Sequence, residues 1–479
     1  MKSLYDITSD ISILETKGNT DITVSSLTLS SSTAEEGSLF TAIVGNIIDG
    51  HLFIADSIKN GARAIVYQND LKDFDHGITY IKVNNTKEAL GVMASNFYGH
   101  PSSKLKLIGI TGTNGKTTTA TLLHRVFRSL GYKAGMIGTV VNKINDDSFE
   151  ADRTTPNAIV LNDLLSRMVE EGCEYCFMEV SSHAVVEKRI SGLLFIGGVF
   201  TNLTLDHLDY HKTIEDYRDA KKEFFDSLGD SAFVLSNLDD ANGEYMLKDS
   251  KAKKYFYSLK NDADLPAGKT SFTEWLETKL IGEFNAYNAL AVYATTALLG
   301  QDKEKVREII KNLEPVEGRF EYFKTKSGVT AIVDYAHTPD ALENVLKTTR
   351  ELCTRQDLVQ KIITVIGCGG DRDKTKRPIM AKIGYDMSDI LILTSDNPRT
   401  EDPISILEDM KNGLPSEAFS GVGKVFIIAD RHEAIKKGIE LAQEGDYTLV
   451  AGKGHEKYQE VNGIKNHFDD MEELKKNFK

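Results

Sequence analysis

The sequence has few cysteines, no long apolar run and no excess of positive charge. Four cysteines in 479 residues do not make the disulfide framework of a small secreted protein. Asp and Glu number 71 against 57 Lys and Arg, a formal net charge of −14, so we expect neither nucleic acid nor an anionic membrane as a partner. The N-terminal segment has no apolar signal core, and no run is long enough to span a bilayer. We therefore expect a cytoplasmic protein.

Two of the cysteines, Cys173 and Cys176, form a lone CxxC motif. Such a motif occurs in redox proteins and in zinc sites, but Cys353 and Cys368 supply no second pair at ligand spacing. The second cysteine of the motif runs directly into the apolar segment FMEV. We therefore predict inert thiols that lead into a strand and pack there.

The length and composition predict a globular α/β protein with two to four domains. Hydrophobic residues make up 41% and charged residues 27%, which is ordinary for a chain that buries a sizeable core. We predict three domains: a small α/β domain over residues 1–102, a doubly wound α/β domain over 103–314 and a Rossmann-like α/β domain over 315–479. Ligands bind at the carboxyl ends of strands in such sheets, so each large domain offers one binding edge.

The segment LIGITGTNGKTTT predicts a phosphate-binding loop between a strand and a helix. Gly112 and Gly115 allow backbone N–H groups to turn toward an anion, Lys116 reaches terminal phosphates, and the Thr117 hydroxyl ligates Mg²⁺. Ile110 stands where a strict P-loop has a glycine, which indicates a variant class of ATPase. The alternative interpretation is a structural turn that only resembles a P-loop.

Acidic and imidazole side chains follow two further apolar runs of the central segment. Glu179 and His183 lie in EVSSHA, and Asp206, His207, Asp209 and His211 lie in LTLDHLDYH. At two neighbouring strand ends, such groups complete the ligand shell of a phosphate-bound metal ion. The alternative is that these histidines are surface or capping residues.

Ordered motifs along almost the whole chain resemble those of the Mur ligases, and within them the branch that adds the third residue of the peptidoglycan stem peptide. They include TGTNGKTTT, TTPNA, EVSSHAV, FTNLTLDHLDYH, YRDAKKEFF, EFNAYNA, EGRFE, VDYAHTPDAL, GCGGDRDKTKRP, TSDNPRTEDP and AGKGHEKYQ. The resemblance implies an ATP-dependent amide ligase. In this family a substrate carboxylate attacks the γ-phosphate of ATP, and an amine then displaces phosphate from the acyl phosphate.

By the same resemblance, Thr117 and Glu179 hold one Mg²⁺, while His207 and a carbamylated Lys221 serve a second. Lys222 is the neighbouring alternative to Lys221. The catalytic residues implied are Lys116, Glu179, His207 and Lys221. The ATP-binding residues implied are Gly112, Thr113, Asn114, Gly115, Lys116, Thr117, Thr118, Asn285, Asn288, Arg319, Asp334 and His337. Because Arg319, Asp334 and His337 come from the third domain or its junction, we expect that domain to move.

The acceptor implied by the family is UDP-N-acetylmuramoyl-L-alanyl-D-glutamate. The residues implied to bind it are Ser31, Asp49, His51, Thr154, Thr155, Ser181 and Arg189. Where the family usually has Asp-Ser-Arg, this chain has Ser30, Ser31 and Ser32. A hydroxyl at residue 32 therefore replaces the usual arginine near the uridine end.

The tetrapeptide DNPR resembles the form found in ligases that add meso-diaminopimelate. Diaminopimelate carries a distal carboxylate that lysine lacks, and the forked guanidinium of Arg399 binds a carboxylate in a bidentate manner. The residues implied for the amino-acid site are Arg372, Asp396, Asn397, Pro398, Arg399, Gly452 and Glu456.

Three alternatives remain at this stage. A lysine-adding ligase of the same family differs in the amino acid that it accepts. A folylpolyglutamate synthetase shares much of the ATPase pattern, and a non-catalytic nucleotide-binding scaffold would leave the metal shell idle. We expect a monomer that uses ATP, Mg²⁺, the UDP-linked dipeptide and diaminopimelate.

Overall fold

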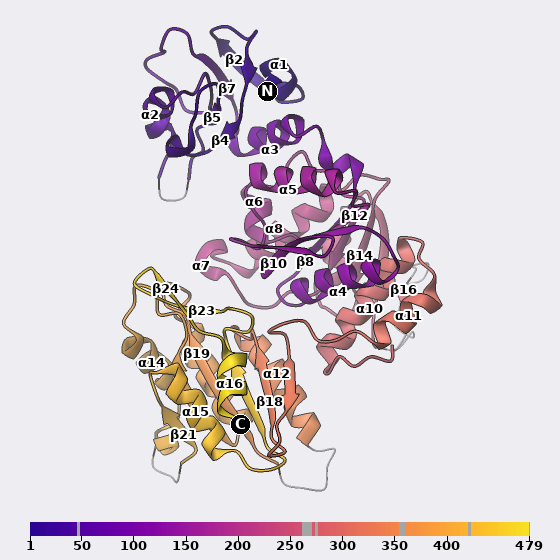
Figure 1. The fold of residues 1–479 in the computed structure, drawn as a ribbon, viewed down its shortest axis with the longest axis vertical. Helices are drawn as coiled ribbons and strands as arrows, with labels where there is room; N and C mark the ends of the chain where they lie inside the picture. The colour runs from indigo at the N-terminus through magenta and orange to yellow at the C-terminus, as the bar shows by residue number, and fades with distance from the viewer. Residues whose placement is uncertain (46–47, 261–270, 274–275, 354–359, 420–422, 479) are drawn as a thin grey trace.

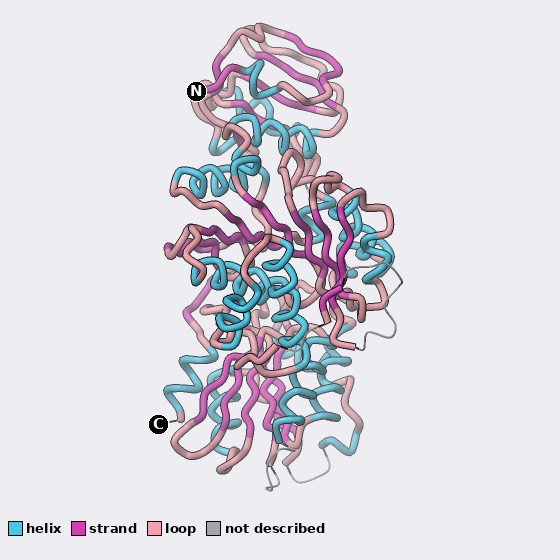
Figure 2. Tube along the Cα trace, turned by 90° about the vertical axis from the view of Figure 1, so that its right-hand side faces the viewer, coloured by secondary structure: helices cyan, strands magenta, loops and turns pink. Residues whose placement is uncertain are grey.

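The computed structural model describes residues 1–45, 48–260, 271–273, 276–353, 360–419 and 423–478. Three α/β units follow one another along the long axis of the molecule, with the N-terminal unit at one end and the C-terminal unit at the other (Figure 1). Each unit has its own sheet with helices packed against it, as the tube view in Figure 2 also shows. The predicted fold class, with three α/β domains, is confirmed.

The N-terminal unit is built on a five-stranded sheet of order β2-β7-β6-β5-β4, in which only β2 is antiparallel to its neighbour. Its strands are β2 (Ile13–Lys17), β4 (Leu27–Thr28), β5 (Leu39–Thr41), β6 (Ala64–Tyr67) and β7 (Thr79–Val83). A two-stranded ladder pairs β1 (Lys2–Ser3) with β3 (Thr23–Val24). The helices are α1 (Leu4–Thr8), α2 (Ile54–Lys59) and α3 (Thr86–Phe97), with short 3₁₀ turns at Ser31–Thr33, Gly50–Phe53 and Pro101–Lys104.

The central unit is built on a nine-stranded sheet of order β11-β10-β9-β12-β8-β13-β14-β15-β16. Its strands are β8 (Lys106–Thr111), β9 (Ala134–Ile137), β10 (Val141–Ile144), β11 (Asp147–Glu150), β12 (Tyr175–Glu179), β13 (Gly197–Phe200), β14 (Phe233–Asn237), β15 (Lys253–Tyr257) and β16 (Ser271–Phe272). Its helices are α4 (Lys116–Ser129), α5 (Ala158–Glu170), α6 (Ser182–Val186), α7 (Leu208–His211), α8 (Ile214–Asp226), α9 (Gly243–Leu247), α10 (Glu283–Leu298) and α11 (Lys303–Lys311). The strands are parallel from β9 to β16, and β10 and β11 form an antiparallel hairpin at the edge.

Both faces of the central sheet are buried, which explains its continuous apolar runs. In β12, Cys176 and Met178 pack into one core, while Tyr175 and Phe177 pack into the core on the opposite face. Cys173 also lies in the first core, and all four cysteines are buried free thiols. The prediction that these cysteines pack in the interior without forming disulfides is confirmed.

The C-terminal unit has a six-stranded sheet of order β17-β18-β22-β19-β20-β21, parallel except for β17. Its strands are β17 (Glu321–Lys324), β18 (Thr330–Asp334), β19 (Ile362–Cys368), β20 (Ile390–Ser395), β21 (Val425–Ile427) and β22 (Tyr447–Ala451), and β23 (Tyr458–Val461) and β24 (Ile464–His467) form a separate hairpin. Its helices are α12 (Pro339–Cys353), α13 (Lys376–Met387), α14 (Pro403–Lys411), α15 (Arg431–Leu441) and α16 (Asp470–Asn477), with a 3₁₀ turn at Ser416–Phe419.

One predicted strand is shorter than its sequence suggests. The run LLFIGGVFTNLT forms a strand only over Gly197–Phe200. Beyond it, the Thr201 hydroxyl donates to the Asn114 carbonyl at 2.6 Å and the Asn202 side chain accepts from the Asn114 backbone N–H at 2.9 Å. After Phe200 the chain therefore does not continue as a strand. Thr201 and Asn202 instead support the loop between β8 and α4, where the phosphate-binding motif lies.

We propose domain boundaries near residues 102 and 314. The first sheet ends at Val83 and α3 at Phe97, before β8 opens the second sheet at Lys106. The central unit ends with α11, and β17 opens the third sheet at Glu321. No helix of the described residues has the length and apolar character needed to cross a membrane.

Candidate active site

The phosphate-binding loop joins β8 to α4 with the geometry that its glycines predict. Gly112 and Gly115 have φ values of 149° and 85°, and a Cβ atom would lie 1.9 Å from Thr201 Oγ1 at the first and 2.5 Å from Asn288 Oδ1 at the second. Both positions therefore require glycine on conformational and steric grounds. The Lys116 Nζ donates to the carbonyl oxygens of Gly112 and Thr113 at 2.9 and 2.8 Å.

Glu179, at the end of β12, lies directly beside this loop. Its carboxylate accepts a hydrogen bond of 3.0 Å from the Thr117 hydroxyl. The backbone N–H of Thr139 donates to the same carboxylate at 2.8 Å and the Thr139 hydroxyl at 3.0 Å. Thr139 is a site residue that sequence reasoning missed, because no motif marks it.

Lys221 points from α8 into the underside of the loop. Its side chain is 1% exposed and its Nζ donates to the Gly112 carbonyl at 2.9 Å. Burial, together with the nearby Lys116 ammonium, holds the pKa of Lys221 well below its usual value. Lys222 points elsewhere and forms ion pairs of 2.6 Å with Asp226 and Asp249. The geometry therefore favours Lys221 over Lys222 as the residue at the site.

The segment 206–211 forms the other wall. The His207 Nε2 lies 3.4 Å from the Asp206 carboxylate, and the His207 and His183 rings meet edge to face with centroids 5.0 Å apart. His211 is buried and its Nε2 lies 2.9 Å from the Ser182 hydroxyl, so His211 holds two helices together. His211 is thus a buried packing residue, which neither the metal-ligand prediction nor the surface or capping alternative described.

The donor set at Thr117 and Glu179 fits a magnesium ion. Two hard oxygen atoms 3.0 Å apart, next to a phosphate-binding loop, match an ion that takes few protein ligands and completes its shell with phosphate oxygens and water. No group of three or more His, Cys, Asp or Glu side chains among the described residues is placed to hold a metal ion by itself. An unmodified Lys221 ammonium does not fit next to a cation.

Arg319 reaches this site from the start of the C-terminal unit. Its guanidinium donates to the Thr117 hydroxyl at 3.2 Å and lies 4.4 Å above the ring of Tyr335. The buried Arg319 Nε has no hydrogen-bond partner among the described residues. An unsatisfied buried donor of a cationic group beside a phosphate-binding loop is suited to an anion.

Asp334 and His337 position the backbone around Arg319. The Asp334 carboxylate accepts from the Phe320 and Ala336 N–H groups at 2.6 and 2.7 Å, and burial raises its pKa to about 6. His337 Nδ1 lies 2.8 Å from the Tyr335 carbonyl oxygen, and burial lowers its pKa to about 4. His337 thus presents Nε2 as an acceptor at neutral pH.

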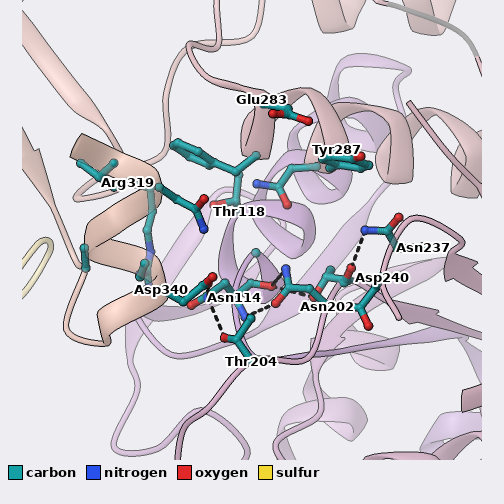
Figure 3. Close-up of a pocket in the computed structure, with 18 of the residues that line it drawn as sticks. Asn114, Thr118, Asn202, Thr204, Asn237, Asp240, Glu283, Tyr287, Arg319 and Asp340 are labelled. Atoms are coloured by element: carbon teal, nitrogen blue, oxygen red, sulfur yellow. Dashed lines mark hydrogen bonds between the residues drawn. The ribbon is translucent and has the colours of Figure 1, made fainter. Parts of the chain in front are cut away.

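A cavity of about 470 Å³ opens beside the loop, between the central and C-terminal units (Figure 3). Among its lining residues are Asn114, Gly115, Thr118, Asn288, Arg319, Asp334 and His337 of the predicted ATP set. Asn285 supports Asn288, whose Nδ2 donates to the Asn285 Oδ1 at 3.3 Å. Figure 3 shows Asp340 pointing toward Asn114, whose Nδ2 donates to the Asp340 carboxylate at 3.0 Å. Sequence reasoning missed Asp340, along with Thr204, Tyr287 and other lining residues.

Four residues predicted to bind the acceptor meet near Glu179. The Thr155 hydroxyl donates to the Glu179 carbonyl at 2.7 Å and accepts from the Ser181 N–H at 3.1 Å. Arg189 donates to the Thr155 carbonyl at 2.9 Å. The hydroxyl of Thr154 accepts from Thr139 at 3.0 Å. Arg189 also lines a cavity of about 430 Å³ between α3, α5 and the β11–α5 loop.

The other members of that set, Ser31, Asp49 and His51, belong to the N-terminal unit. The His51 Nδ1 and Asp49 carboxylate are 2.6 Å apart, and His51 Nε2 accepts from the Gln68 and Asn69 N–H groups. Ser31 begins a 3₁₀ turn in which the Ser30 hydroxyl accepts from the Ser32 N–H. The hydrogen bonds of Asp49 and His51 are therefore made within the N-terminal unit.

The residues predicted to bind the amino acid come together at the carboxyl ends of β20 and β22. Asn397 donates to the Glu456 carboxylate at 2.7 Å, and a Cβ atom on Gly452 would lie 2.6 Å from Asp396 Oδ2. Arg399, which follows Pro398 and has a φ of 52°, donates to the Gly370 carbonyl at 2.6 Å. Arg372 is exposed and donates to the Asp371 carbonyl.

Lys453 is a member of this cluster that sequence reasoning missed. Its side chain is 0% exposed, and its Nζ donates to Asn397 Oδ1 at 2.9 Å and lies 3.7 and 3.4 Å from the carboxylates of Asp396 and Glu456. The Lys453 cation helps to hold the pKa of Asp396 below its usual value against the effect of burial, whereas burial and Asp396 raise that of Glu456. Its place inside the GKGHE motif was the available signal.

Family models of the Mur ligases match all three units of the chain. The Mur ligase middle domain matches residues 110–296, the Mur ligase glutamate ligase domain matches 318–454, and the Mur ligase family catalytic domain matches 23–98. Proteins of Phocaeicola vulgatus and Cytophaga hutchinsonii are 50% and 51% identical to this chain. The alignments cover 98% of the chain in both cases, and 98% and 97% of the two relatives. Both relatives are named UDP-N-acetylmuramoyl-L-alanyl-D-glutamate–2,6-diaminopimelate ligase.

The fold agrees with this sequence relationship. A solved UDP-N-acetylmuramoyl-L-alanyl-D-glutamate–2,6-diaminopimelate ligase superimposes with a TM-score of 0.63 and 32% identity, covering 95% of this chain and 94% of that structure. The resemblance inferred from the motifs is thereby confirmed at the level of the family. The chain belongs to the Mur ligase family.

Proposed function

We propose that this protein is the ATP-dependent ligase that joins meso-diaminopimelate to UDP-N-acetylmuramoyl-L-alanyl-D-glutamate in peptidoglycan precursor synthesis. The observation that carries the proposal is that one chain holds three groups of residues, each suited to one part of this reaction. The phosphate-binding loop lies beside Glu179, Arg319 reaches the same loop from the C-terminal unit, and the DNPR segment forms a polar cluster at the strand ends of that unit. Relatives about 50% identical over the full length carry the name of this activity.

Catalysis in this proposal consists of positioning and of charge neutralisation. The backbone around Gly112 and Gly115 cradles the phosphates of ATP, and Lys116 and Arg319 bring positive charge to the γ-phosphate. The substrate carboxylate attacks that phosphate and ADP leaves. The amine then attacks the acyl carbon, the new C–N bond forms as the C–O bond to phosphate breaks, and inorganic phosphate departs.

A magnesium ion fits the proposed site at Thr117 and Glu179. When bound, it supplies Lewis-acid neutralisation of the phosphate oxygens. We also propose that His207 and a carbamylated Lys221 serve a second ion, since carbamylation turns an amine into a carboxylate-like ligand. The remaining members of the predicted set hold the acceptor through Thr154, Thr155, Ser181 and Arg189, and its uridine end near Ser31, Asp49 and His51.

We further propose that the protein acts as a monomer in the cytoplasm. All the residues assigned to the reaction belong to one chain, and the substrates, ATP and a UDP-linked precursor, are cytoplasmic compounds. Light scattering coupled to gel filtration tests the first statement, because a dimeric mass would overturn it.

The decisive experiment measures ATP-dependent phosphate release with Mg²⁺ and the UDP-muramoyl dipeptide. Its three arms contain meso-diaminopimelate, L-lysine or no amino acid. We expect release with diaminopimelate alone. Release with lysine would retain the ligase but overturn the role of Arg399, and no release with either amino acid would favour a nucleotide-binding scaffold.

A further inference from the structure

Arg431 and Asp470 form a fully buried ion pair beneath the amino-acid cluster. Both side chains are 0% exposed. The guanidinium binds the carboxylate in a bidentate manner, with Nε to Oδ1 at 2.8 Å and Nη2 to Oδ2 at 2.7 Å. Arg431 is the first residue of α15 and Asp470 the first residue of α16. The pair thus joins the C-terminal helix α16 to α15.

The remaining donors of Arg431 reach the ends of two strands. Nη1 donates to the Ser395 carbonyl at 3.3 Å and Nη2 to the Ala451 carbonyl at 3.1 Å. Ser395 is the last residue of β20 and Ala451 the last residue of β22. The residues that follow are Asp396 and Gly452, which begin the two loops of the amino-acid site. One guanidinium therefore bridges the starting points of both loops.

We propose that the Arg431–Asp470 pair positions the two loops for recognition of the incoming amino acid, and that α16 is thereby part of the specificity apparatus. The inference rests on the proposed function, because it takes the cluster at Asp396 and Glu456 to be the amino-acid site. Arg431 and Asp470 are positioning residues. They act through Ser395 and Ala451 and touch no substrate.

The electrostatics of the cluster agree with this role. Asp396 and Glu456 are two carboxylates that share the buried ammonium of Lys453. A buried cation must be paired, and Asp470 supplies that partner for Arg431, so that the guanidinium remains fixed under the strand ends. A shift of either strand end would change the distance between Asn397 and Glu456, which are joined by a single hydrogen bond of 2.7 Å.

A second contact between the same two helices provides a matched control. The His432 Nδ1 lies 2.5 Å from the Glu473 carboxylate, so it also links α15 to α16. The two side chains are partly exposed, at 37% and 18%, and within the described part of the chain neither is hydrogen-bonded to a strand-end carbonyl. Glu473→Gln therefore weakens helix docking while leaving the bridge to the strand ends in place.

The test compares Asp470→Asn and Glu473→Gln with the unaltered protein in the phosphate-release assay. We expect Asp470→Asn to raise the KM for diaminopimelate about tenfold or more, as for the loss of one charge-assisted hydrogen bond. The KM for ATP should change less than about twofold, and Glu473→Gln should leave both constants unchanged. An equal rise in both KM values, or a rise in the control as well, would overturn the proposal.

A second variant guards against misfolding of the first. Replacing a buried ion pair by apolar residues of similar volume commonly preserves stability, so Arg431→Met with Asp470→Leu removes the bridge and retains the packing. A folded double variant with a raised KM for diaminopimelate supports the proposal, and one with an unaltered KM overturns it. The unaltered protein separates the test of the ligase activity from the test of the Arg431–Asp470 pair. If the unaltered protein fails to use diaminopimelate, the proposed function itself is rejected.

Discussion

Gly318 and Gly454 contact each other through their backbones. A Cβ atom on Gly454 would lie 2.7 Å from the Gly318 carbonyl oxygen, and one on Gly318 would lie 2.4 Å from the Gly454 carbonyl carbon. Both residues have positive φ, at 65° and 53°. Gly318 precedes Arg319, and Gly454 lies between Gly452 and Glu456 of the amino-acid cluster. The loop that carries Arg319 is therefore packed directly against the loop that carries Gly452 and Glu456.

The first prediction is that Gly454→Ala lowers kcat because it displaces Arg319. The added methyl group meets backbone atoms that cannot rotate away, so we expect a loss of about 1–3 kcal/mol in stability. We also expect kcat to fall at saturating concentrations of all three substrates. Phosphate release and thermal unfolding measure the two effects.

Gly463→Ala is the control for this variant. Gly463 has a φ of 78° and no atom within 4 Å of the position of a Cβ atom. It therefore carries the conformational cost of an alanine without the close contact. Equal losses of kcat in the two variants would show that the backbone contact does not couple the two loops.

The second prediction concerns Arg399. Arg399→Ala should raise the KM for diaminopimelate steeply. In the proposed site the Arg399 guanidinium donates two charge-assisted hydrogen bonds to the distal carboxylate of diaminopimelate, and each contributes about 1.5–3 kcal/mol. The KM for ATP should hardly change. Arg399→Lys retains the charge but loses the fork, so we expect an intermediate KM. Equal rises in the two KM values would contradict the assignment of Arg399 to the amino acid.

The third prediction separates Lys221 from Lys222. Lys221→Ala should lower kcat at least about a hundredfold, as for removal of one strong transition-state interaction, because Lys221 lies directly against the phosphate-binding loop. Lys222→Ala should keep most of the activity, since Lys222 pairs with Asp226 and Asp249 and not with the phosphate-binding loop. Mass spectrometry of the native protein tests the carbamyl group on Lys221. Comparable losses in both variants would reject the assignment.

The sequence predicted the residues that lie in contiguous motifs at strand ends. Lys116, Thr117 and Glu179 could be found because a glycine-rich turn and an acidic strand end have recognisable local chemistry. Their contacts follow from the parallel order of β12, β8 and β13, which brings their carboxyl ends to one edge. The fold class was predictable for the same reason, since alternating apolar runs and helices imply a parallel sheet.

Several of the residues that sequence reasoning missed act through contacts between distant segments. Asn114 and Asp340 are 226 residues apart in the chain, and Arg431 and Asp470 are 39 apart. No local pattern marks an aspartate as the partner of one particular arginine. Such pairs depend on how separate elements are packed, which the periodicity of a single segment does not encode.

The last prediction concerns the dependence of stability on pH. His124, on the buried face of α4, has its Nε2 at 3.2 Å from the Ala134 carbonyl and 3.0 Å from that of Asn145. Burial lowers its pKa from 6.5 to about 4. Between those two values the unfolded chain binds more protons than the folded protein, so the free energy of unfolding falls as the pH falls from about 6.5 to about 4.

This contribution of His124 amounts to about 3 kcal/mol over the whole interval, at 1.36 kcal/mol for each pKa unit. His124→Gln retains a side-chain donor for the two carbonyls but does not titrate, so its stability should fall less steeply in acid. His467→Gln is the control, because His467 is exposed and its pKa is raised by Glu472, which gives a dependence of the opposite sign. Denaturant unfolding at pH 7.5, 6 and 5 measures these slopes, and parallel curves for His124→Gln and the unaltered protein would refute the role of His124.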